Sequence, residues 1–318
     1  MSLADHPGRE PQSTGSVLMV RPARFACNPQ TADSNAFQQR PTPVGGDDLQ
    51  AAALREFEAL ALALERAGVE VLIAADAPEP AKPDAIFPNN WVSFHHDGTV
   101  ALYPMLALNR RWERREAILE QVIRQGSFRV LRTVDLTHRE AEEKFLEGTG
   151  SVVLDRTHRV AYACSSPRTD LDVLGEFAQQ LDYELMTFDA MDRGGRAIYH
   201  TNVLMAIGTA FAVICGDAIP HADHRAAVFS MLRSTGHAIV DITLEQMERF
   251  AANVLELASP AGTLIALSMT ALDSLNRTQR GILESHAALV AVPIPTIERV
   301  GGGGVRCMLA EIHLPKRA

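Results

Sequence analysis

One unit recurs along nearly the whole sequence, and this repetition constrains the fold more than any other feature. Each copy is predicted to form a β-hairpin, a helix and a further strand, at a period of roughly 50–60 residues. In the copy over residues 145–188, the predicted hairpin FLEGTGSVVLDRTHRVAYACSS is followed by a helix over residues 170–181 and a strand over residues 184–188. About five copies fit into the chain, because the other segments repeat this order.

The remaining copies are defined by the same alternation of hydrophobic patterns. Helices are expected over residues 47–68, 110–125, 221–234 and 272–286, and single strands over residues 69–74, 128–136, 238–242 and 289–293. The segment after Cys307 alternates in polarity and should pair with a strand over residues 17–20, so that both chain ends belong to one unit. We therefore predict an α/β fold whose units close into a propeller of about five blades. An α/β sandwich is the alternative, because periodicity alone does not separate the two.

Composition excludes several classes of protein. The chain has 318 residues, 47% of them hydrophobic, and can bury a large core. A flexible tail is expected over residues 1–16, followed by one domain over residues 17–318. The net charge of −9 argues against nucleic-acid binding, and no apolar run reaches the roughly 18 residues that span a bilayer. The four cysteines lack a metal-binding spacing and no export signal is visible, which favours free thiols in the cytoplasm.

Four consecutive glycines at residues 301–304 precede the predicted last strand and leave room for a ligand beside Cys307. Arg306 is the chain neighbour of this cysteine, and a nearby cation favours the reactive thiolate over the thiol. Together these features indicate a nucleophilic cysteine at the mouth of a strand. A flexible glycine hinge before an inert core cysteine is the alternative, and this segment alone does not decide between them.

Three further polar segments stand before predicted strands. They are DAIFPNNW with Asp84, Asn89 and Asn90, EGTGS with Glu147, and HTN with His200 and Asn202. If the strand ends of different blades converge on the propeller axis, two acids, an imidazole and a thiol share one cavity. Each segment also has a purely structural explanation, since Asp and Asn bond to nearby backbone in turns. A histidine at a strand start can likewise be held by hydrogen bonds alone.

These motifs, taken in order, resemble those of the guanidine-modifying, or pentein, superfamily of arginine deiminases, dimethylarginine hydrolases and amidinotransferases. The resemblance covers nearly the whole chain, through RPARFACNPQTADSNAFQ, DAIFPNNW, LEGTGSVVLDR, YHTNVLMAIG and GGGGVRCMLAEIHLP. It is greatest with the branch of citrulline-utilisation hydrolases. The resemblance implies a five-bladed α/β propeller with a Cys–His–acid site on its axis, and neither a metal nor a cofactor is expected.

Carried over to this sequence, the resemblance implies that Cys307 is the nucleophile and His200 the general acid and base. Glu147 would orient the histidine and bind the planar head of the substrate. Asp84 would bind the substrate as well. The expected substrate-binding set is completed by Asn89, Asn90, Asn202 and Arg306. A non-catalytic binding scaffold with the same fold is disfavoured, because the nucleophile, the histidine and both acids are all present.

Two residues depart from the deiminase pattern: Asn90 and Asn202 stand where deiminases carry aspartates that contact the guanidinium. A buried guanidinium needs carboxylates opposite it, and each pair at ~4 Å contributes roughly 4 kcal/mol before desolvation at an effective dielectric near 20. Amides suit a neutral ureido head better. Citrulline is therefore the expected substrate, hydrolysed to ornithine, ammonia and carbon dioxide through an S-carbamoyl enzyme. An arginine or dimethylarginine deiminase, or an amidinotransferase, stays open as an alternative.

An amino-acid substrate also needs a cation to hold its carboxylate. The candidates are Arg110, Arg111, Arg168 and Arg299. The loop over residues 21–41, with Asn35 and Phe37, is expected to act as a lid. The expected partner is a small amino-acid substrate, with neither a nucleic acid nor a membrane, and homodimerisation is left open.

Overall fold

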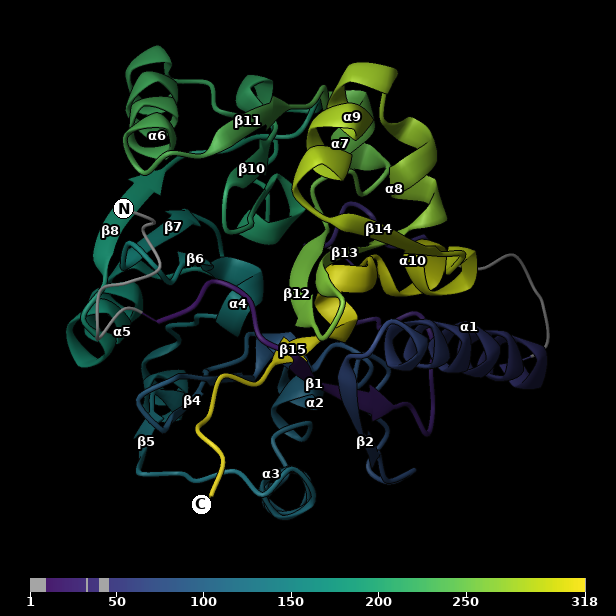
Figure 1. The fold of residues 1–318 in the computed structure, drawn as a ribbon. Helices are drawn as coiled ribbons and strands as arrows, with labels where there is room; N and C mark the ends of the chain where they lie inside the picture. The colour runs from purple at the N-terminus through teal and green to yellow at the C-terminus, as the bar shows by residue number, and fades with distance from the viewer. Residues whose placement is uncertain (1–9, 33, 40–45, 318) are drawn as a thin grey trace.

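The strands of the protein form five separate three-stranded sheets that share one plan (Figure 1). The structure is a computed structural model that describes residues 10–32, 34–39 and 46–317. In each sheet the first two strands are antiparallel, and the third strand is parallel to the second. The repeated unit predicted from the sequence therefore corresponds to one sheet with its connecting helix.

Within each sheet the middle strand forms hydrogen bonds with both of its neighbours. In this order, the five sheets are β15 (Ala310–Glu311), β1 (Ser16–Arg21) and β2 (Glu70–Ala75); β3 (Val92–Phe94), β4 (Thr99–Leu102) and β5 (Arg132–Asp135); β6 (Val153–Asp155), β7 (Val160–Cys164) and β8 (Glu184–Phe188); β9 (Met205–Ile207), β10 (Phe211–Ile214) and β11 (Ala238–Asp241); and β12 (Leu255–Ser259), β13 (Gly262–Ser268) and β14 (Ala288–Val292).

A helix crosses over between the two parallel strands of every sheet, as parallel pairing requires. These crossover helices are α1 (Gly46–Arg66), α3 (Glu116–Gln125), α5 (Leu171–Leu181), α6 (Ala222–Ser234) and α9 (Arg277–His286). They lie at the periphery, with the sheets towards the centre (Figure 1). The shorter helices are α2 (Leu108–Arg111), α4 (Gly148–Ser151), α7 (Leu244–Glu248), α8 (Met269–Ser274) and α10 (Pro295–Gly301).

Helix α5 shows how the local sequence sets these elements. The side chain of Asp170 accepts hydrogen bonds from the first backbone N–H groups and caps the helix. Leu174, Phe177 and Leu181 recur at helical spacing and are buried against the sheet. Asp182 then takes a left-handed conformation with φ 57°, which ends the helix. The same patterns made this unit the clearest one in the sequence.

The two ends of the chain share the first sheet, as predicted. Val17 lies opposite Glu311, and Leu18 lies opposite Ala310, in an antiparallel pairing. The last strand is only two residues long, whereas the alternation after Cys307 predicted a longer one. The residues before it instead form a turn of 3₁₀ helix, Val305–Met308.

Two predicted helices are each split in two. The helix expected over residues 110–125 consists of α2 and α3, and the one over residues 272–286 consists of α8 and α9. Asn276 explains the second break, because its side chain accepts from the backbone N–H of Gln279 and starts a new helix with a capping box. The short helix α10 was not predicted; Pro295 stands in its first turn, where a missing N–H costs nothing.

Part of the segment predicted as a loose tail is anchored. Glu10 forms ion pairs with Arg156 at 2.9 Å and Arg159 at 3.0 Å. The Gln12 side chain donates to the backbone oxygens of Leu154 and Ile207. Residues 10–15 therefore correct the prediction, because they are tied to the third and fourth sheets. The rest of the predicted tail, residues 1–9, lies outside the described residues.

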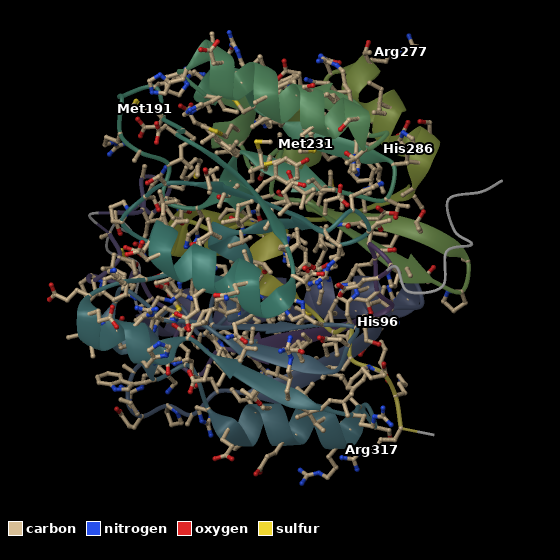
Figure 2. All side chains as sticks on the ribbon, turned by 90° about the vertical axis from the view of Figure 1, so that its left-hand side faces the viewer. His96, Met191, Met231, Arg277, His286 and Arg317 are labelled. Atoms are coloured by element: carbon tan, nitrogen blue, oxygen red, sulfur yellow. The ribbon has the colours of Figure 1, made fainter. Side chains whose placement is uncertain are left out.

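The first strands of different sheets approach one another: β15 contacts β3, β6 contacts β9, and β9 contacts β12. In the perpendicular view, side chains fill the space between the ribbons, while Arg277 and Arg317 lie near the surface (Figure 2). The mixed α/β class and the five repeated units are confirmed. Closure into a propeller and the single-domain boundary stay predictions. Among the described helices, none has the length and apolar character needed to cross a membrane.

Candidate active site

Each of the four polar segments identified in the sequence forms one helical turn just before a strand. These turns are Pro88–Asn90 before β3, α4 before β6, Thr201–Val203 before β9 and Val305–Met308 before β15. The prediction that His200 and Cys307 stand directly at a strand mouth is therefore wrong by one turn. Close approach of neighbouring segments explains the local geometry: Gly148 has φ +50°, and a Cβ there would lie 2.3 Å from the Asn89 carbonyl oxygen.

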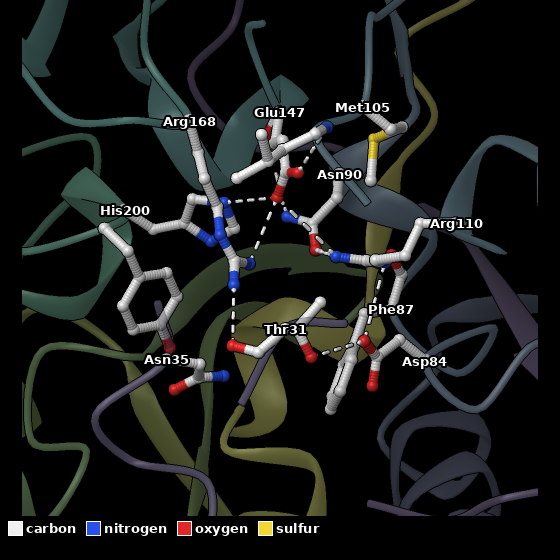
Figure 3. A network of polar contacts seen from close by, with 12 residues as sticks. Thr31, Asn35, Asp84, Phe87, Asn90, Met105, Arg110, Glu147, Arg168 and His200 are labelled. Atoms are coloured by element: carbon white, nitrogen blue, oxygen red, sulfur yellow. Dashed lines mark hydrogen bonds and ion pairs between the residues drawn. The ribbon is translucent and has the colours of Figure 1, made fainter. Parts of the chain in front are cut away.

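Side chains from these turns meet around one small cavity of about 20 Å³. Its walls come from residues far apart in the sequence, namely Asn35, Asp84, Phe87, Asn90, Arg110, Arg168, Tyr199, His200, Gly301, Gly302, Gly303 and Cys307. Most of these side chains, together with Glu147, point towards one another in Figure 3. The expected convergence of a thiol, an imidazole and two acids is thus present in the structure.

Cys307 is buried, with 6% of its surface exposed. Two side-chain amides contact its sulfur: Nδ2 of Asn202 lies 3.4 Å from Sγ and Nδ2 of Asn253 lies 3.3 Å from it. Burial raises the pKa of the Cys307 thiol, and the amides and Arg306 offset this only in part. The cation beside the cysteine therefore does not by itself produce a resting thiolate, in contrast to the sequence-based expectation.

His200 is held by Glu147. Its Nε2 lies 2.9 Å from Oε2 of Glu147, and the backbone N–H of Leu106 donates to Oε1 at 3.1 Å. Burial lowers the pKa of His200 to about 4, so the ring is neutral at neutral pH. Because the carboxylate accepts only, Nε2 carries the proton and Nδ1 keeps a lone pair. The acid thus sets the tautomer needed for a general base.

Glu147 stays ionised although it is fully buried. Burial alone would raise its pKa, but Arg168, His200 and Arg110 outweigh this effect and hold the pKa well below its ordinary value. Arg168 lies 3.3 Å from Oε2 and Arg110 lies 3.7 Å from it. The same oxygen serves three cationic or N–H groups, so Glu147 organises the site (Figure 3).

Arg110 links the two acids of the site. It pairs with Glu113 through two contacts of 2.9 and 3.0 Å and donates to Oδ1 of Asn90 at 2.9 Å. Its Nε lies 3.8 Å from Oδ2 of Asp84. Burial raises the pKa of Glu113 to about 7 in spite of this pairing. The amide of Asn90 therefore holds a protein arginine in this structure.

Asp84 is fixed through one oxygen only. Its Oδ2 accepts from Asn28 at 2.7 Å and from Thr31 at 3.3 Å. Its buried Oδ1 has no hydrogen-bond partner among the described residues. Burial raises the pKa of Asp84 above its ordinary value. The free oxygen is a natural acceptor for an N–H group of a ligand.

The segment expected to act as a lid covers the cavity. Arg168 donates to Oγ of Ser34 at 2.6 Å and to the backbone oxygen of Thr31 at 3.3 Å. Asn35 reaches the glycine turn, where its Nδ2 lies 3.3 Å from the oxygen of Gly302. Gly302 has φ +67° and a Cβ there would lie 2.6 Å from Asn35, so this contact requires a glycine. Residues 33, 40 and 41 of the expected lid lie outside the described residues.

Four of the predicted binding residues lie elsewhere. Arg306 points away from the cavity to Glu311, at 2.9 Å, because that buried carboxylate needs a cation. Asn89 is buried, and neither polar atom of its side chain has a partner within the described part of the chain. Arg111 lies 3.4 Å from Glu140. Arg299 lines a separate pocket, beside Phe37. Of the four candidate arginines, Arg110 and Arg168 line the cavity.

Sequence reasoning missed Asn253 and Glu113. The repeat itself carried a signal for Asn253, which stands two residues before β12, just as Asn90 stands two residues before β3. Comparing the units position by position would have identified it. Glu113 has no such signal, since its role depends on where Arg110 lies. Tyr199 was also missed; its ring lies over the Arg168 guanidinium at 4.9 Å.

A family model described as N,N dimethylarginine dimethylhydrolase, eukaryotic, matches residues 21–314. No curated protein matches the chain. Among solved structures, the apo form of ArgZ, an arginine dihydrolase from the ornithine–ammonia cycle in cyanobacteria, is 18% identical with a TM-score of 0.69. The match covers 95% of this chain and 41% of ArgZ, so this chain spans less than half of that protein.

Two further structures have the same fold. The N-terminal domain of ArgZ, as a cysteine-to-serine variant bound to substrate, is 17% identical with a TM-score of 0.68, over 93% of this chain and 97% of that domain. A cysteine-to-serine variant of the Pseudomonas aeruginosa enzyme DDAH, complexed with citrulline, is 16% identical with a TM-score of 0.65, over 94% of this chain and 100% of that one. At these identities the likeness establishes the fold.

Proposed function

Because the chain belongs to the family of N,N-dimethylarginine dimethylhydrolases, we propose that it is a cysteine-dependent hydrolase of a ureido carbon–nitrogen bond. The substrate that fits best is citrulline, which would give ornithine, ammonia and carbon dioxide through an S-carbamoyl intermediate on Cys307. Membership confirms the superfamily that the sequence motifs predicted. The finer assignment to the citrulline-utilisation branch belongs to this proposal.

The surroundings of the Cys307 sulfur carry the proposal. Asn202 and Asn253 direct Nδ2 at the sulfur, and within the described residues their Oδ1 atoms have no hydrogen-bond partner. Oδ1 of Asp84 is in the same condition. A buried acceptor without a partner costs about 1–3 kcal/mol, which a ligand rich in N–H groups would recover. A ureido head carries N–H donors on both sides of its carbonyl and matches these acceptors.

The charges around the cavity favour a head without charge. The carboxylates of Asp84 and Glu147 stand against the guanidinium groups of Arg110 and Arg168, and all four are buried. Glu113 adds little negative charge at neutral pH, because its pKa is raised to about 7. Citrulline is a zwitterion with a neutral head, so it leaves this balance intact. Arginine would add a buried cation with no free carboxylate pair opposite it.

The substrate carboxylate is assigned to Arg110 and Arg168, which line the cavity. One guanidinium nitrogen of Arg168 donates to Ser34 and to the backbone of Thr31, both uncharged partners. A carboxylate binds a guanidinium more strongly than these groups do. The cavity of about 20 Å³ holds roughly one water. Substrate entry therefore requires the segment that carries Thr31 and Ser34 to move, and this movement frees Arg168.

The first half-reaction begins from a neutral thiol and a neutral imidazole. As Sγ of Cys307 attacks the ureido carbon, the thiol proton passes to Nδ1 of His200. Glu147 stabilises the imidazolium that forms, because its carboxylate already accepts from Nε2. The C–N bond to the side chain of the substrate then breaks, and His200 returns the proton to the departing amine. The products are ornithine and the S-carbamoyl enzyme.

In the second half-reaction, neutral His200 takes a proton from water as the water oxygen attacks the carbamoyl carbon. The C–S bond breaks, and the proton returns to the sulfur of Cys307. Carbamic acid leaves and decomposes to ammonia and carbon dioxide. The imidazole thus acts twice in each cycle, once in each direction.

The decisive test is incubation of the protein separately with citrulline, arginine and asymmetric dimethylarginine, with detection of ornithine, citrulline and ammonia. We expect ornithine and ammonia in equal amounts from citrulline. Cys307→Ser should abolish turnover. Conversion of arginine or dimethylarginine to citrulline, with citrulline unchanged, would establish the deiminase alternative. Transfer of the group to an added amine would establish an amidinotransferase.

Three structural predictions join this proposal. The five sheets would close into a propeller around the cavity, since their first strands contact one another in succession. Residues 17–318 would form a single domain. The protein would work in the cytoplasm on a small amino-acid substrate, with its homodimerisation open.

A further inference from the structure

We propose that Asp155, His158 and His237 form a binding site for a divalent transition-metal ion, and that Zn²⁺ fits it best. Asp155 is the last residue of β6, His158 lies in the turn between β6 and β7, and His237 directly precedes β11. Glu147 stands beyond the other end of β6. The site therefore lies away from the catalytic cavity, between the third and fourth sheets.

The donor atoms are already close to metal-binding positions. The carboxylate oxygens of Asp155 lie 2.9 and 3.0 Å from Nδ1 of His158, and Oδ2 lies 3.8 Å from Nε2 of His237. Two ligands of a tetrahedral zinc ion stand roughly 3.3–3.5 Å apart. Side-chain shifts of about half an ångström would suffice. This is the only such group of three His, Cys, Asp or Glu residues in the part of the chain that the structure describes.

The orientation of His237 is set by Thr235. Oγ1 of Thr235 lies 2.8 Å from Nδ1 of His237 and also 3.0 Å from the backbone oxygen of Met231. When the hydroxyl proton goes to Met231, Oγ1 accepts from the Nδ1–H group, and Nε2 is left with a lone pair. That lone pair then faces the oxygen of Gly208 at 3.2 Å and Oδ2 of Asp155 at 3.8 Å.

Three acceptors facing one another repel unless a cation lies between them. The opposite tautomer of His237, with Thr235 donating to Nδ1, would relieve this by sending an Nε2 proton to Gly208. The two tautomers therefore correspond to a metal-free and a metal-bound form of the same site. A hydrogen bond from the outer ring nitrogen to a fixed acceptor is the usual support of a metal-binding histidine.

Burial and access also suit a metal site. The side chains of Asp155 and His237 are 1% exposed, whereas that of His158 is 19% exposed. An ion could enter past His158 and be held by the two buried ligands. Two imidazole nitrogens and one carboxylate oxygen are donors that Zn²⁺ accepts readily, with a fourth position for water.

The inferred role is structural. The ligands join the third sheet, whose preceding turn carries Glu147, to the fourth, whose preceding turn carries His200. A bound ion would tie these sheets together at the end opposite the Glu147–His200 pair. Because an ion that binds only the folded protein stabilises it, the melting temperature should rise with metal concentration.

The test titrates Zn²⁺ and Co²⁺ into chelator-treated full-length protein by calorimetry, in the Cys307→Ser background so that the active-site thiol cannot bind metal. We expect one ion per chain, a raised melting temperature, and a Co²⁺ spectrum with d–d bands and without thiolate charge transfer. Thr235→Val should weaken binding by roughly 10- to 100-fold. His158→Gln should weaken it further, and its partly exposed position makes it the safest ligand to change.

The matched control is His221→Gln, which removes an exposed histidine on another part of the fourth unit. It should leave stoichiometry, affinity and the metal-induced rise in melting temperature unchanged. Three results would overturn the site: binding weaker than millimolar, binding that His158→Gln leaves intact, or a thiolate signature in the Co²⁺ spectrum. Because binding is measured in a catalytically inactive background, the outcome does not depend on the proposed hydrolase activity.

Discussion

Two buried clusters of charge lie on either side of Cys307, and they are built from the same residue types. The Glu147 cluster comprises Asp84, Arg110, Glu113, Glu147 and Arg168. The Glu311 cluster comprises Glu10, Arg156, Arg306, Glu311 and His313. In both, carboxylates are kept ionised by buried arginines: the pKa of Glu10 is lowered to about 2, with burial opposing the shift and Arg156 causing most of it.

The difference is in what remains unpaired. In the Glu147 cluster, the buried Oδ1 of Asp84 and Nε of Arg168 have no partner among the described residues. In the Glu311 cluster, and within the same described ranges, no buried side-chain nitrogen or oxygen lacks a partner. A cluster that satisfies itself stabilises the fold, whereas one with open donors and acceptors next to a cavity can bind a ligand. Charge and burial alone do not distinguish the two.

The largest expected effect is that of His200→Ala. Because the imidazole accepts and returns a proton in each half-reaction, kcat should fall by about 10²–10⁴-fold. The variant should keep its fold, since neither arginine of the Glu147 cluster loses its carboxylate. Steady-state kinetics with citrulline, together with thermal unfolding, measure both quantities. Residual activity within tenfold of the wild type would remove His200 from the mechanism.

A pair of buried arginines separates the clusters directly. Arg156→Met should lower the free energy of unfolding by about 3–5 kcal/mol, because Glu10 and Glu311 lose a buried partner. The KM of the folded fraction should not change. Arg168→Met should destabilise the protein as well, but should also raise KM for citrulline by roughly 10- to 100-fold. Denaturant unfolding and kinetics on both variants give the comparison, and an equal rise in KM for Arg156→Met would contradict it.

Asn253→Ala should have a smaller effect, confined to catalysis. It removes an amide that contacts Sγ, and a hydrogen bond to a charged group contributes about 1.5–3 kcal/mol. We expect kcat/KM to fall by roughly 10- to 100-fold and the ultraviolet signal of the thiolate to appear at higher pH. Asn89→Ala is the matched control, because Asn89 is also a buried asparagine but does not contact the sulfur. Equal losses in the two variants would show that packing, not the sulfur contact, is responsible.

The smallest effect expected under ordinary conditions is the pH dependence. The pKa of His200 is lowered to about 4 by burial, so its Nδ1 can accept a proton above this pH and cannot below it. Activity should therefore be constant as pH falls from 7 and then drop through about pH 4. Circular dichroism at each pH distinguishes this titration from unfolding. An acid limb near the ordinary histidine value of 6.5 would mean that the ring is better solvated than the structure indicates.

Local patterns in the sequence predicted much of the architecture. The helices and strands of the third unit follow from hydrophobic periodicity and from a cap such as Asp170, and both are local signals. Motifs also predicted that Cys307, His200, Glu147 and Asp84 belong to one site. The split helices were missed, because the capping role of Asn276 is visible only once the helix is known to restart there.

The five-fold repetition and the set of groups able to do the chemistry are properties of the sequence alone. Which arginines serve the site depends on the folded chain: Arg306 adjoins the nucleophile yet points to Glu311, whereas Arg168, far away in the chain, contacts Glu147. Folding likewise brought Asn253 to the sulfur and His237 to Asp155. The physical reason is that buried charges are distributed by pairing across the whole core, and such pairing depends on distances between segments that no local sequence pattern records.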